Sequence, residues 1–123
     1  MIVVTTDFVT GCEIEETLGL VRGNTVRAKH IGRDWMAGFR QVVGGEIKSY
    51  TDMLQEAREQ ALERMAAQAE EAGADAVITC RLVTSEIMQR ASEVLAYGTA
   101  VKLRPAGGEG TSGRVPSFGR EES

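Results

Sequence analysis

Aromatic residues and proline are scarce in this chain of 123 residues. Phe, Trp and Tyr make up 5% of the sequence, so a folded core has to be built from Val, Ile, Leu, Met and Ala. No run of about 18 apolar residues occurs, and we therefore expect no membrane span. The first ten residues lack both a basic region and a long apolar stretch, so we do not expect a secretory signal.

Cysteine, histidine and positive charge are also in short supply. The chain has two cysteines and one histidine. Without an export signal, Cys12 and Cys80 are expected to be free thiols and the protein to be cytoplasmic. Lys and Arg number 14 against 18 Asp and Glu, which gives a net charge of −4. Nucleic-acid binding needs an excess of cations to neutralise phosphates, so no nucleic-acid partner is expected.

The chain divides into a body and a tail. Residues 105–123 contain both prolines and five of the 14 glycines. This composition buries too little apolar surface to offset the entropy of ordering, which predicts a disordered Gly/Pro/Ser-rich tail. Residues 1–104 then form one small domain that buries only about 60–70% of its unfolded surface. Oligomerisation would supply further burial.

Alternating apolar and polar residues predict five strands, Ile2–Thr6, Glu13–Arg22, Thr25–Ile31, Asp75–Ser85 and Glu93–Leu103. The Gly23-Asn24 pair between the second and third of these predicts a tight hairpin. In the fourth strand, alternation places Ile78, Cys80 and Leu82 on one face. The last strand has an unusually small face of Ala96, Gly98 and Ala100, which would let a helix or another subunit approach closely.

Two helices are expected between the strands. Arg33–Val43 reads as a short helix, and Glu46 to about Ala72 as a long one that ends at Gly73, where a left-handed cap belongs. The apolar stripe of the long helix consists of Ile47, Tyr50, Leu54, Ala57, Ala61, Met65, Ala69 and Ala72. The order β-β-β-α-α-β-β predicts an α+β domain of two layers, an antiparallel sheet covered by the long helix plus the short helix.

Several segments together resemble the YbjQ-like family. They are RGNTVRAKHIGRD, VVGGEIKSYTDMLQEAREQALERM, GADAV and SEIMQRASEVLAYGTAV, which occur in the family's order and cover nearly all of residues 1–104. VGGEI-x-x-Y-T is the most specific block. The family is labelled "putative heavy-metal-binding" and its function is uncharacterised. The resemblance implies a two-layer subunit similar to dodecin-like folds that assembles into a ring-shaped homopentamer, and it implies no activity.

The sequence departs from the family pattern at two places. Trp35-Met36 stands where relatives usually have smaller residues. Arg90 stands where a glycine is usual, in the turn between the last two strands. The aromatic pair Trp35 and Phe39 is the best candidate for an apolar contact between subunits, with packing inside one subunit as the alternative.

Heavy-metal binding is the first function to weigh. Soft-metal sites use thiolate, imidazole or thioether ligands at repeated short spacings. Cys12, His30 and Cys80 are the candidate ligands for a soft divalent metal, but they are far apart, and no CxxC or HxxxH occurs. Core packing is the preferred interpretation of Cys80. A site shared between subunits around a ring axis would escape this argument.

Catalysis has weaker support. A nucleophile needs a base within hydrogen-bond reach, yet His30 is the only imidazole and no G-x-S-x-G motif surrounds a serine. Glu15 and Glu16 are adjacent on a strand and point to opposite faces. We therefore assign no catalytic residue.

Anion binding remains as an alternative. Gly44-Gly45 precedes the long helix, whose N-terminus offers unpaired N–H groups and positive potential. The pair lacks the Lys-Ser/Thr ending of a phosphate loop, so a hinge between two helices is the simpler interpretation. The candidate ligand-binding residues are Arg27, His30, Arg33, Gly44, Gly45, Glu46 and Tyr50.

The preferred function is a non-catalytic, homo-oligomeric binding or scaffold module of five copies whose partner is itself. The alternatives are a heavy-metal-binding protein and an enzyme or binder that acts on a small anionic ligand.

Overall fold

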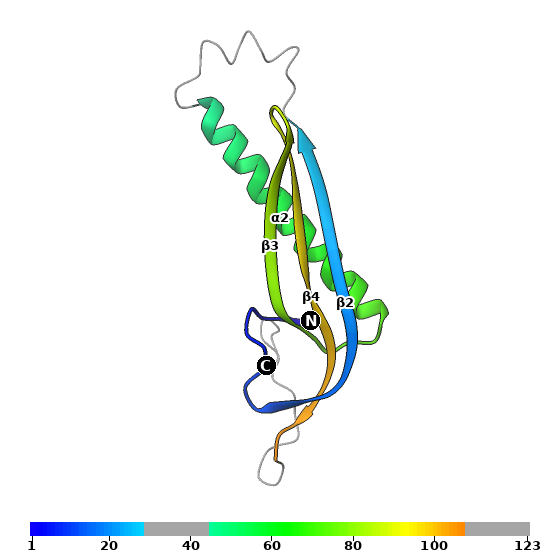
Figure 1. The fold of residues 1–123 in the computed structure, drawn as a ribbon. Helices are drawn as coiled ribbons and strands as arrows, with labels where there is room; N and C mark the ends of the chain where they lie inside the picture. Colours follow the sequence, from blue (N-terminus) through cyan, green and yellow to red (C-terminus); the bar gives the residue numbers. More distant parts are fainter. Residues whose placement is uncertain (29–44, 108–123) are drawn as a thin grey trace.

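The computed structural model describes residues 1–28 and 45–107, in which one long helix lies across a four-stranded sheet (Figure 1). The elements are β1 (Ile2–Val3), β2 (Cys12–Ala28), α2 (Gly45–Glu71), β3 (Ala76–Met88) and β4 (Ala91–Pro105). The predicted α+β class is confirmed. The short helix predicted over Arg33–Val43, with Trp35 and Phe39, lies outside the described residues, and so do residues 108–123 of the predicted tail. Pro105, the first residue of that predicted tail, is instead the last residue of β4 and pairs with Cys12.

The sheet is mixed rather than antiparallel throughout as predicted. Its strand order is β1-β3-β4-β2, and β4 runs antiparallel to both β2 and β3. β1 runs parallel to β3, with Ile2 opposite Ala76 and Val3 opposite Val77. Parallel neighbours need a long crossover between them, and here the chain passes through β2 and α2 before it returns to β1.

The hairpin predicted at Gly23-Asn24 is wrong. β2 runs unbroken through both residues, which pair with β4 in one continuous ladder. Gly23 serves close packing instead, because a Cβ at this position would overlap the backbones of Ala61 and Met65 in α2. The predicted β-β-β-α-α-β-β order therefore has one strand too many before the helices.

The long helix agrees with its prediction. α2 spans Gly45–Glu71, and four residues of its apolar stripe are fully buried at 0% exposure, Ala57, Ala61, Met65 and Ala69. Tyr50 and Leu54 are half-buried, whereas Ala72 is exposed. α2 is not long and apolar enough to cross a membrane.

Gly73 ends α2 as predicted, with a φ of 88°. Its N–H donates to the carbonyl of Glu70 at 3.0 Å, and the N–H of Ala74 donates to that of Ala69 at 3.0 Å. This pair of bonds is the Schellman pattern, which satisfies carbonyls that the helix end would leave open.

The small face of β4 packs against α2. Ala96 and Ala100 are fully buried in the same apolar cluster as the alanine stripe of the helix, together with Val21 of β2 and Val94. Alanine on both sides lets the helix axis lie close to the sheet, as the composition of the strand predicts.

A β-bulge changes the predicted faces of β3. Thr79 has a φ of 55°, and the register between β3 and β4 shifts between Ile78 and Arg81. Ile78 and Cys80 consequently pack in separate clusters on opposite faces of the sheet. The prediction that they share a face is wrong, because alternation along the sequence assumes a strand without bulges.

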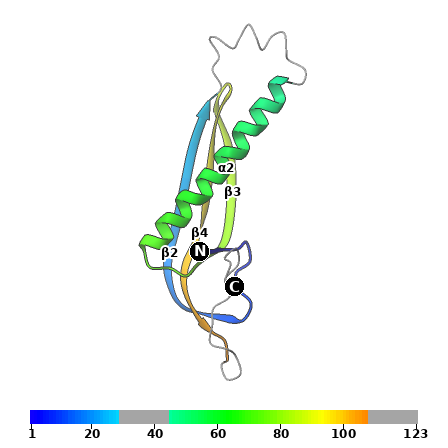
Figure 2. The ribbon, with the colours of Figure 1, turned by 180° about the vertical axis from the view of Figure 1, so that it is seen from behind.

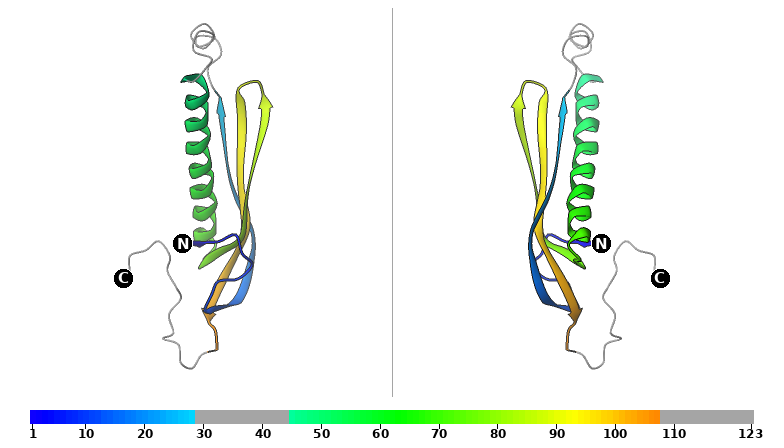
Figure 3. Two further views of the ribbon diagram at one scale, coloured as in Figure 1. Left: turned by 90° about the vertical axis from the view of Figure 1, so that its left-hand side faces the viewer. Right: turned by 90° about the vertical axis from the view of Figure 1, so that its right-hand side faces the viewer.

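Among the described residues, only the N-terminal segment covers the face of the sheet opposite α2, and it does so at one end. There the N-terminal segment contributes Ile2 and Val9 to a second apolar cluster with Val101 and Leu103 of β4. In the side views of Figure 3, α2 follows the sheet along its length, while the β3–β4 hairpin diverges from the helix toward its tip. The view from behind in Figure 2 shows α2 crossing in front of the strands.

The tip of that hairpin carries a non-glycine residue in the left-handed region. Arg90 has a φ of 61°. A side chain in this conformation costs free energy that glycine avoids, which agrees with the glycine that the family resemblance implies here.

Gly23→Ala should destabilise the fold, since the added methyl group meets helix backbone that cannot rotate away. We expect the free energy of unfolding to fall by about 1–3 kcal/mol, the usual cost of overpacking. Urea denaturation at fixed protein concentration measures it, with Thr17→Ala on the exposed part of β2 as the matched control. Equal stability of the two variants would contradict the close approach of α2 to β2.

Candidate functional site

Arg27, a predicted ligand-binding residue near the end of β2, is bound to α2. Its guanidinium donates to Gln60 Oε1 at 2.8 Å and to Glu56 Oε1 at 3.4 Å. The Glu56 side chain is 71% exposed, so solvent screens the ion pair and its contribution to stability is small. Because a carboxylate already accompanies the Arg27 charge, this side chain is a poor anchor for an anion.

Tyr50, a second predicted residue, joins α2 to β4. Its hydroxyl forms a 2.8 Å hydrogen bond with Ser92 Oγ, in which either oxygen can donate. Ser92 is only 3% exposed, and a buried hydroxyl without a partner would cost about 1–3 kcal/mol. The contact therefore has a sufficient structural explanation.

The remaining predicted ligand-binding residues have no described side chain. His30, Arg33 and Gly44 lie outside the described residues, and Gly45 and Glu46 are described only as the first two residues of α2. The structure does place the end of β2 and the start of α2 at the same end of the molecule (Figure 1). The anion-binding hypothesis for this end stays a prediction.

The exposed side of α2 near its start is acidic. A shallow hollow of about 540 Å³ is lined by Ser49, Asp52, Met53, Gln55, Glu56 and Glu59. Three carboxylates on one surface repel an anionic ligand. This side of the helix is therefore unsuited to the small anion proposed from the sequence.

The two cysteines are free thiols in separate surroundings. Cys12 is partly buried against the cluster of Ile2 and Val9, and Cys80 is 5% exposed beneath α2. Burial raises the pKa of both thiols above the ordinary value of 9.0. The charge of Asp75 adds to the rise in pKa for Cys12, while that of Arg81 opposes it for Cys80.

Raised pKa values work against metal ligation by these residues. A soft metal binds the thiolate, and both thiols are protonated at neutral pH. In residues 1–28 and 48–107, moreover, no three side chains of His, Cys, Asp or Glu converge as a metal site. His30, the third candidate ligand, lies outside the described residues.

The sequence analysis missed the exposed apolar side chains in the second half of β3. Residues 81–89 are all exposed, including Leu82, Val83, Ile87 and Met88. The sequence does contain a signal for this exposure, because the four apolar residues occupy both odd and even positions. In a strand that pattern places apolar side chains on both faces.

The thiols should react slowly with iodoacetamide in the folded protein, because alkylation requires the thiolate. Because the pKa of each thiol is higher in the folded than in the unfolded state, a smaller fraction is thiolate in the folded protein. The difference in rate shrinks only as the pH rises through the folded pKa.

We use the Cys12→Ser variant, in which Cys80 is the one thiol. At pH 7.5 we expect Cys80 to react at least about tenfold more slowly in the folded variant than in the same variant unfolded in urea. Mass spectrometry of the labelled protein measures both rates, and Cys80→Ser reports on Cys12 in the same way. Labelling at the unfolded rate would contradict the buried, protonated state of Cys80.

Comparison with known proteins finds relatives that match nearly all of residues 1–104. A protein designated UPF0145 from Photobacterium profundum is 61% identical over 103 residues, which cover 84% of this chain and 100% of that relative. Another from Fervidobacterium nodosum is 62% identical over 104 residues, 85% of this chain and 96% of the relative.

A crystal structure of a Pediococcus pentosaceus protein of unknown function, assigned to the DUF74 family, has a TM-score of 0.58 at 15% identity and covers 84% of this chain and 97% of that chain. That likeness shows the fold alone. The sequence model of the YbjQ family, described as "Putative heavy-metal-binding", matches residues 1–104. On this match and the identity of about 60% to its relatives, the chain belongs to the YbjQ family.

Proposed function

We propose that this protein is a non-catalytic subunit of a homo-oligomeric binding or scaffold assembly. The observation that carries the proposal is the apolar surface left uncovered on the sheet. A single copy places α2 on one face and the N-terminal segment over one end of the other face. No other residue that the structure describes covers the rest of that face.

The part of the face opposite α2 that the N-terminal segment leaves uncovered carries exposed apolar side chains on β2 and β3. Leu20 lies opposite Thr99, and Val26 lies opposite Glu93, on the side of β4 that points away from the helix. Both are more than half exposed, at 65% and 56%. Val83 of β3, 44% exposed, joins the same face. Arg22 and Asn24 lie between Leu20 and Val26 on the same face and are exposed as well. Exposed apolar side chains bordered by polar ones favour a contact surface.

A ring of identical subunits is the assembly that we infer. The chain resembles proteins whose two-layer, dodecin-like subunits form homopentamers, and five copies require a contact between two different surfaces of the subunit. A small domain gains stability from such contacts because its own core buries a limited fraction of its surface.

The contacts of Arg27 and Tyr50 support a role without catalysis. Arg27 and Tyr50 are the predicted ligand-binding residues whose side chains the structure describes, and each has a hydrogen bond between α2 and the sheet that accounts for it. They tie the helix to the two strands that it covers.

Native mass spectrometry of untagged protein tests the assembly. We expect a discrete oligomer at micromolar concentration, with five copies as the predicted number and a mass that is a multiple of 13.3 kDa. Light scattering on the same sample provides an independent mass. A monomer by both methods would refute the proposal.

Heavy-metal binding is the second candidate function, favoured by the description of the family that the chain belongs to. The candidate metal ligands predicted from the sequence are Cys12, His30 and Cys80. Elemental analysis of protein purified without a metal-affinity tag measures any retained metal.

If the cysteines are ligands, Cys12→Ser or Cys80→Ser lowers the metal content by at least about tenfold, the typical loss of affinity even when only a supporting partner of a ligand is removed. Their burial and raised pKa lead us to expect no change. His30→Ala is the companion variant. A metal lost in it alone would place the site in the segment that contains His30.

A further inference from the structure

β3 carries a threonine at a bulge position where glycine is usual. Thr79 and Cys80 stand together opposite Gly98 of β4, and Thr79 has a φ of 55°. When the first residue of a bulge is left-handed it is ordinarily glycine, whereas other bulges have a right-handed first residue. A β-branched side chain costs free energy in the left-handed region, so contacts from outside β3 must hold Thr79 there.

The segment between β1 and β2, residues 4–11, provides these contacts, and we call it the strap. The N–H of Thr79 donates to the carbonyl of Thr6 at 2.8 Å, and the N–H of Cys80 donates to the carbonyl of Val4 at 3.0 Å. Both bonds run from the bulge to the strap. They keep Thr79 left-handed as long as the strap lies against β3.

One charged side chain links the strap and β3 as well. Arg81 Nη1 donates to the carbonyl of Thr5 at 3.0 Å and to that of Cys80 at 2.9 Å. The first carbonyl belongs to the strap and the second to β3. Arg81 therefore holds the strap next to the residue that is strained.

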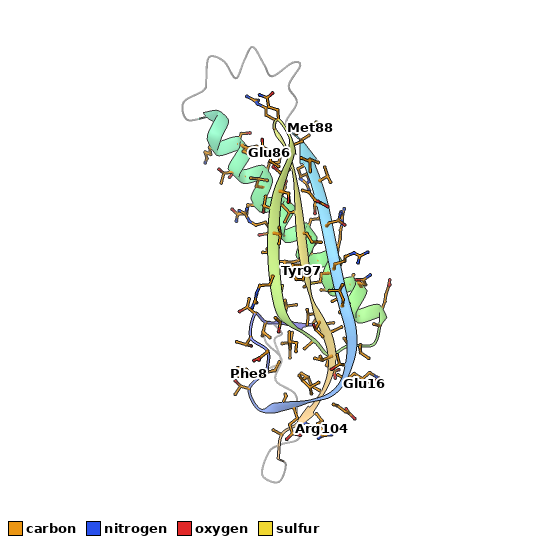
Figure 4. The ribbon with its side chains drawn as sticks, in the orientation of Figure 1. Phe8, Glu16, Glu86, Met88, Tyr97 and Arg104 are labelled. Carbon is orange, nitrogen blue, oxygen red and sulfur yellow. The ribbon has the colours of Figure 1, made fainter. Side chains whose placement is uncertain are left out.

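Among the described residues, little else holds the strap in place. Four consecutive residues, Thr5 to Phe8, are exposed, and Phe8 is 55% exposed. Val9 is 4% exposed and packs in the second apolar cluster. Figure 4 shows Phe8 far from the hairpin end of the molecule, where Glu86 and Met88 lie. Local opening is typical of a segment with few buried contacts and exposed hydrogen bonds.

We infer that the strap is a detachable cover, which opens as one unit while the rest of the protein stays folded. Opening breaks the bonds from Thr79, Cys80 and Arg81 together, since all three end on residues 4–6. It also lets Thr79 leave the left-handed region, so the relief of strain offsets part of the lost hydrogen bonding. The inference concerns a single copy and goes beyond the proposed assembly.

The closed strap occupies an edge that another strand could use. In the open form the N–H groups of Thr79 and Cys80 are free, and the side chains of Ile78, Val101 and Leu103 lose the cover of the strap. An extended peptide adds to a sheet through such an edge, with neighbouring side chains in apolar contact. The strap is thus an autoinhibitory contact made by the chain's own carbonyls.

Hydrogen exchange resolved to single amides tests the opening in the intact protein. The protection factor compares the exchange rate of an unstructured chain with the measured rate. We expect Thr79 and Cys80 to share one protection factor, at least about tenfold below that of Val94 and Ala96. The latter two lie in β4, between two other strands, and exchange only through wider unfolding. Equal protection of Cys80 and Ala96 would overturn the inference.

Thr79→Gly removes the strain that favours opening. We expect the protection factor of Cys80 to rise about three- to tenfold, because glycine adopts the left-handed region without this cost. Arg90→Gly is the matched control, since Arg90 has a φ of 61° at the hairpin tip, away from the strap. It should leave Cys80 at the parent value. The same change in both variants, or no change in either, would contradict a strap that opens separately.

Arg81→Met removes the link between the strap and β3 and keeps an apolar side chain of similar length. We expect the protection factors of Thr79 and Cys80 to fall by about threefold or more. Arg22→Met is its control, because the Arg22 side chain has no hydrogen bond to any residue that the structure describes. Unchanged protection in Arg81→Met would overturn the inference.

Native mass spectrometry of the same samples keeps the two proposals distinguishable. A monomer in which Thr79→Gly slows exchange at Cys80 refutes the homo-oligomer and supports the strap. An oligomer with equal protection at Cys80 and Ala96 overturns the strap alone. If Arg81→Met fails to fold, the pair Thr79→Gly and Arg90→Gly decides.

Discussion

The close contact between α2 and the sheet is the constraint on which the rest of the structure depends. The contact is close because the residues that face each other are small. They are Gly23 on β2, Ala96 on β4, and Ala57 and Ala61 on the helix. Glycine and alanine contribute little apolar area each, so this contact stabilises the fold through fit over the length of the helix rather than through a few large side chains.

That contact also decides which strand is left without cover. With its stripe on β2 and β4, α2 projects Gln68 and Arg64 past the stripe to the β2 edge, where they bind backbone groups. The same placement moves the helix away from β3, so Leu82, on the helix side of the sheet opposite Ala96, stays 42% exposed. Protection of one edge and exposure of the other are two results of one helix position.

The sequence was sufficient for the elements whose pattern has one structural meaning. The apolar stripe of α2 and the small face of β4 were predicted correctly, since a row of alanines on a helix and a strand face of alanine and glycine fit closely against each other. Gly23-Asn24 was not, because glycine before a polar residue serves a turn and a close approach equally well, and the helix that approaches is distant in sequence. The bulge at Thr79 leaves no mark in the alternation, so the faces of Ile78 and Cys80 could not be assigned.

The candidate site was less predictable than the fold for a physical reason. Arg27 and Tyr50 were selected because their chemistry suits a ligand, but the same guanidinium and hydroxyl also suit the bonds that they make between α2 and the sheet. Spacing in the sequence does not distinguish these uses, since the partner of Tyr50, Ser92, is 42 positions away. His30 and Arg33 lie outside the described residues, so their roles remain those that the sequence proposes.

The unequal edges of the sheet bear on the symmetry of the assembly. If two β3 edges met each other, the contact would be two-fold and would by itself close at two copies. A ring of five needs a contact between two different surfaces of each copy. The middle of the β2 edge cannot be either surface, since Gln68 and Arg64 already occupy its backbone groups. The assembly that we propose must therefore use surfaces other than the middle of the β2 edge.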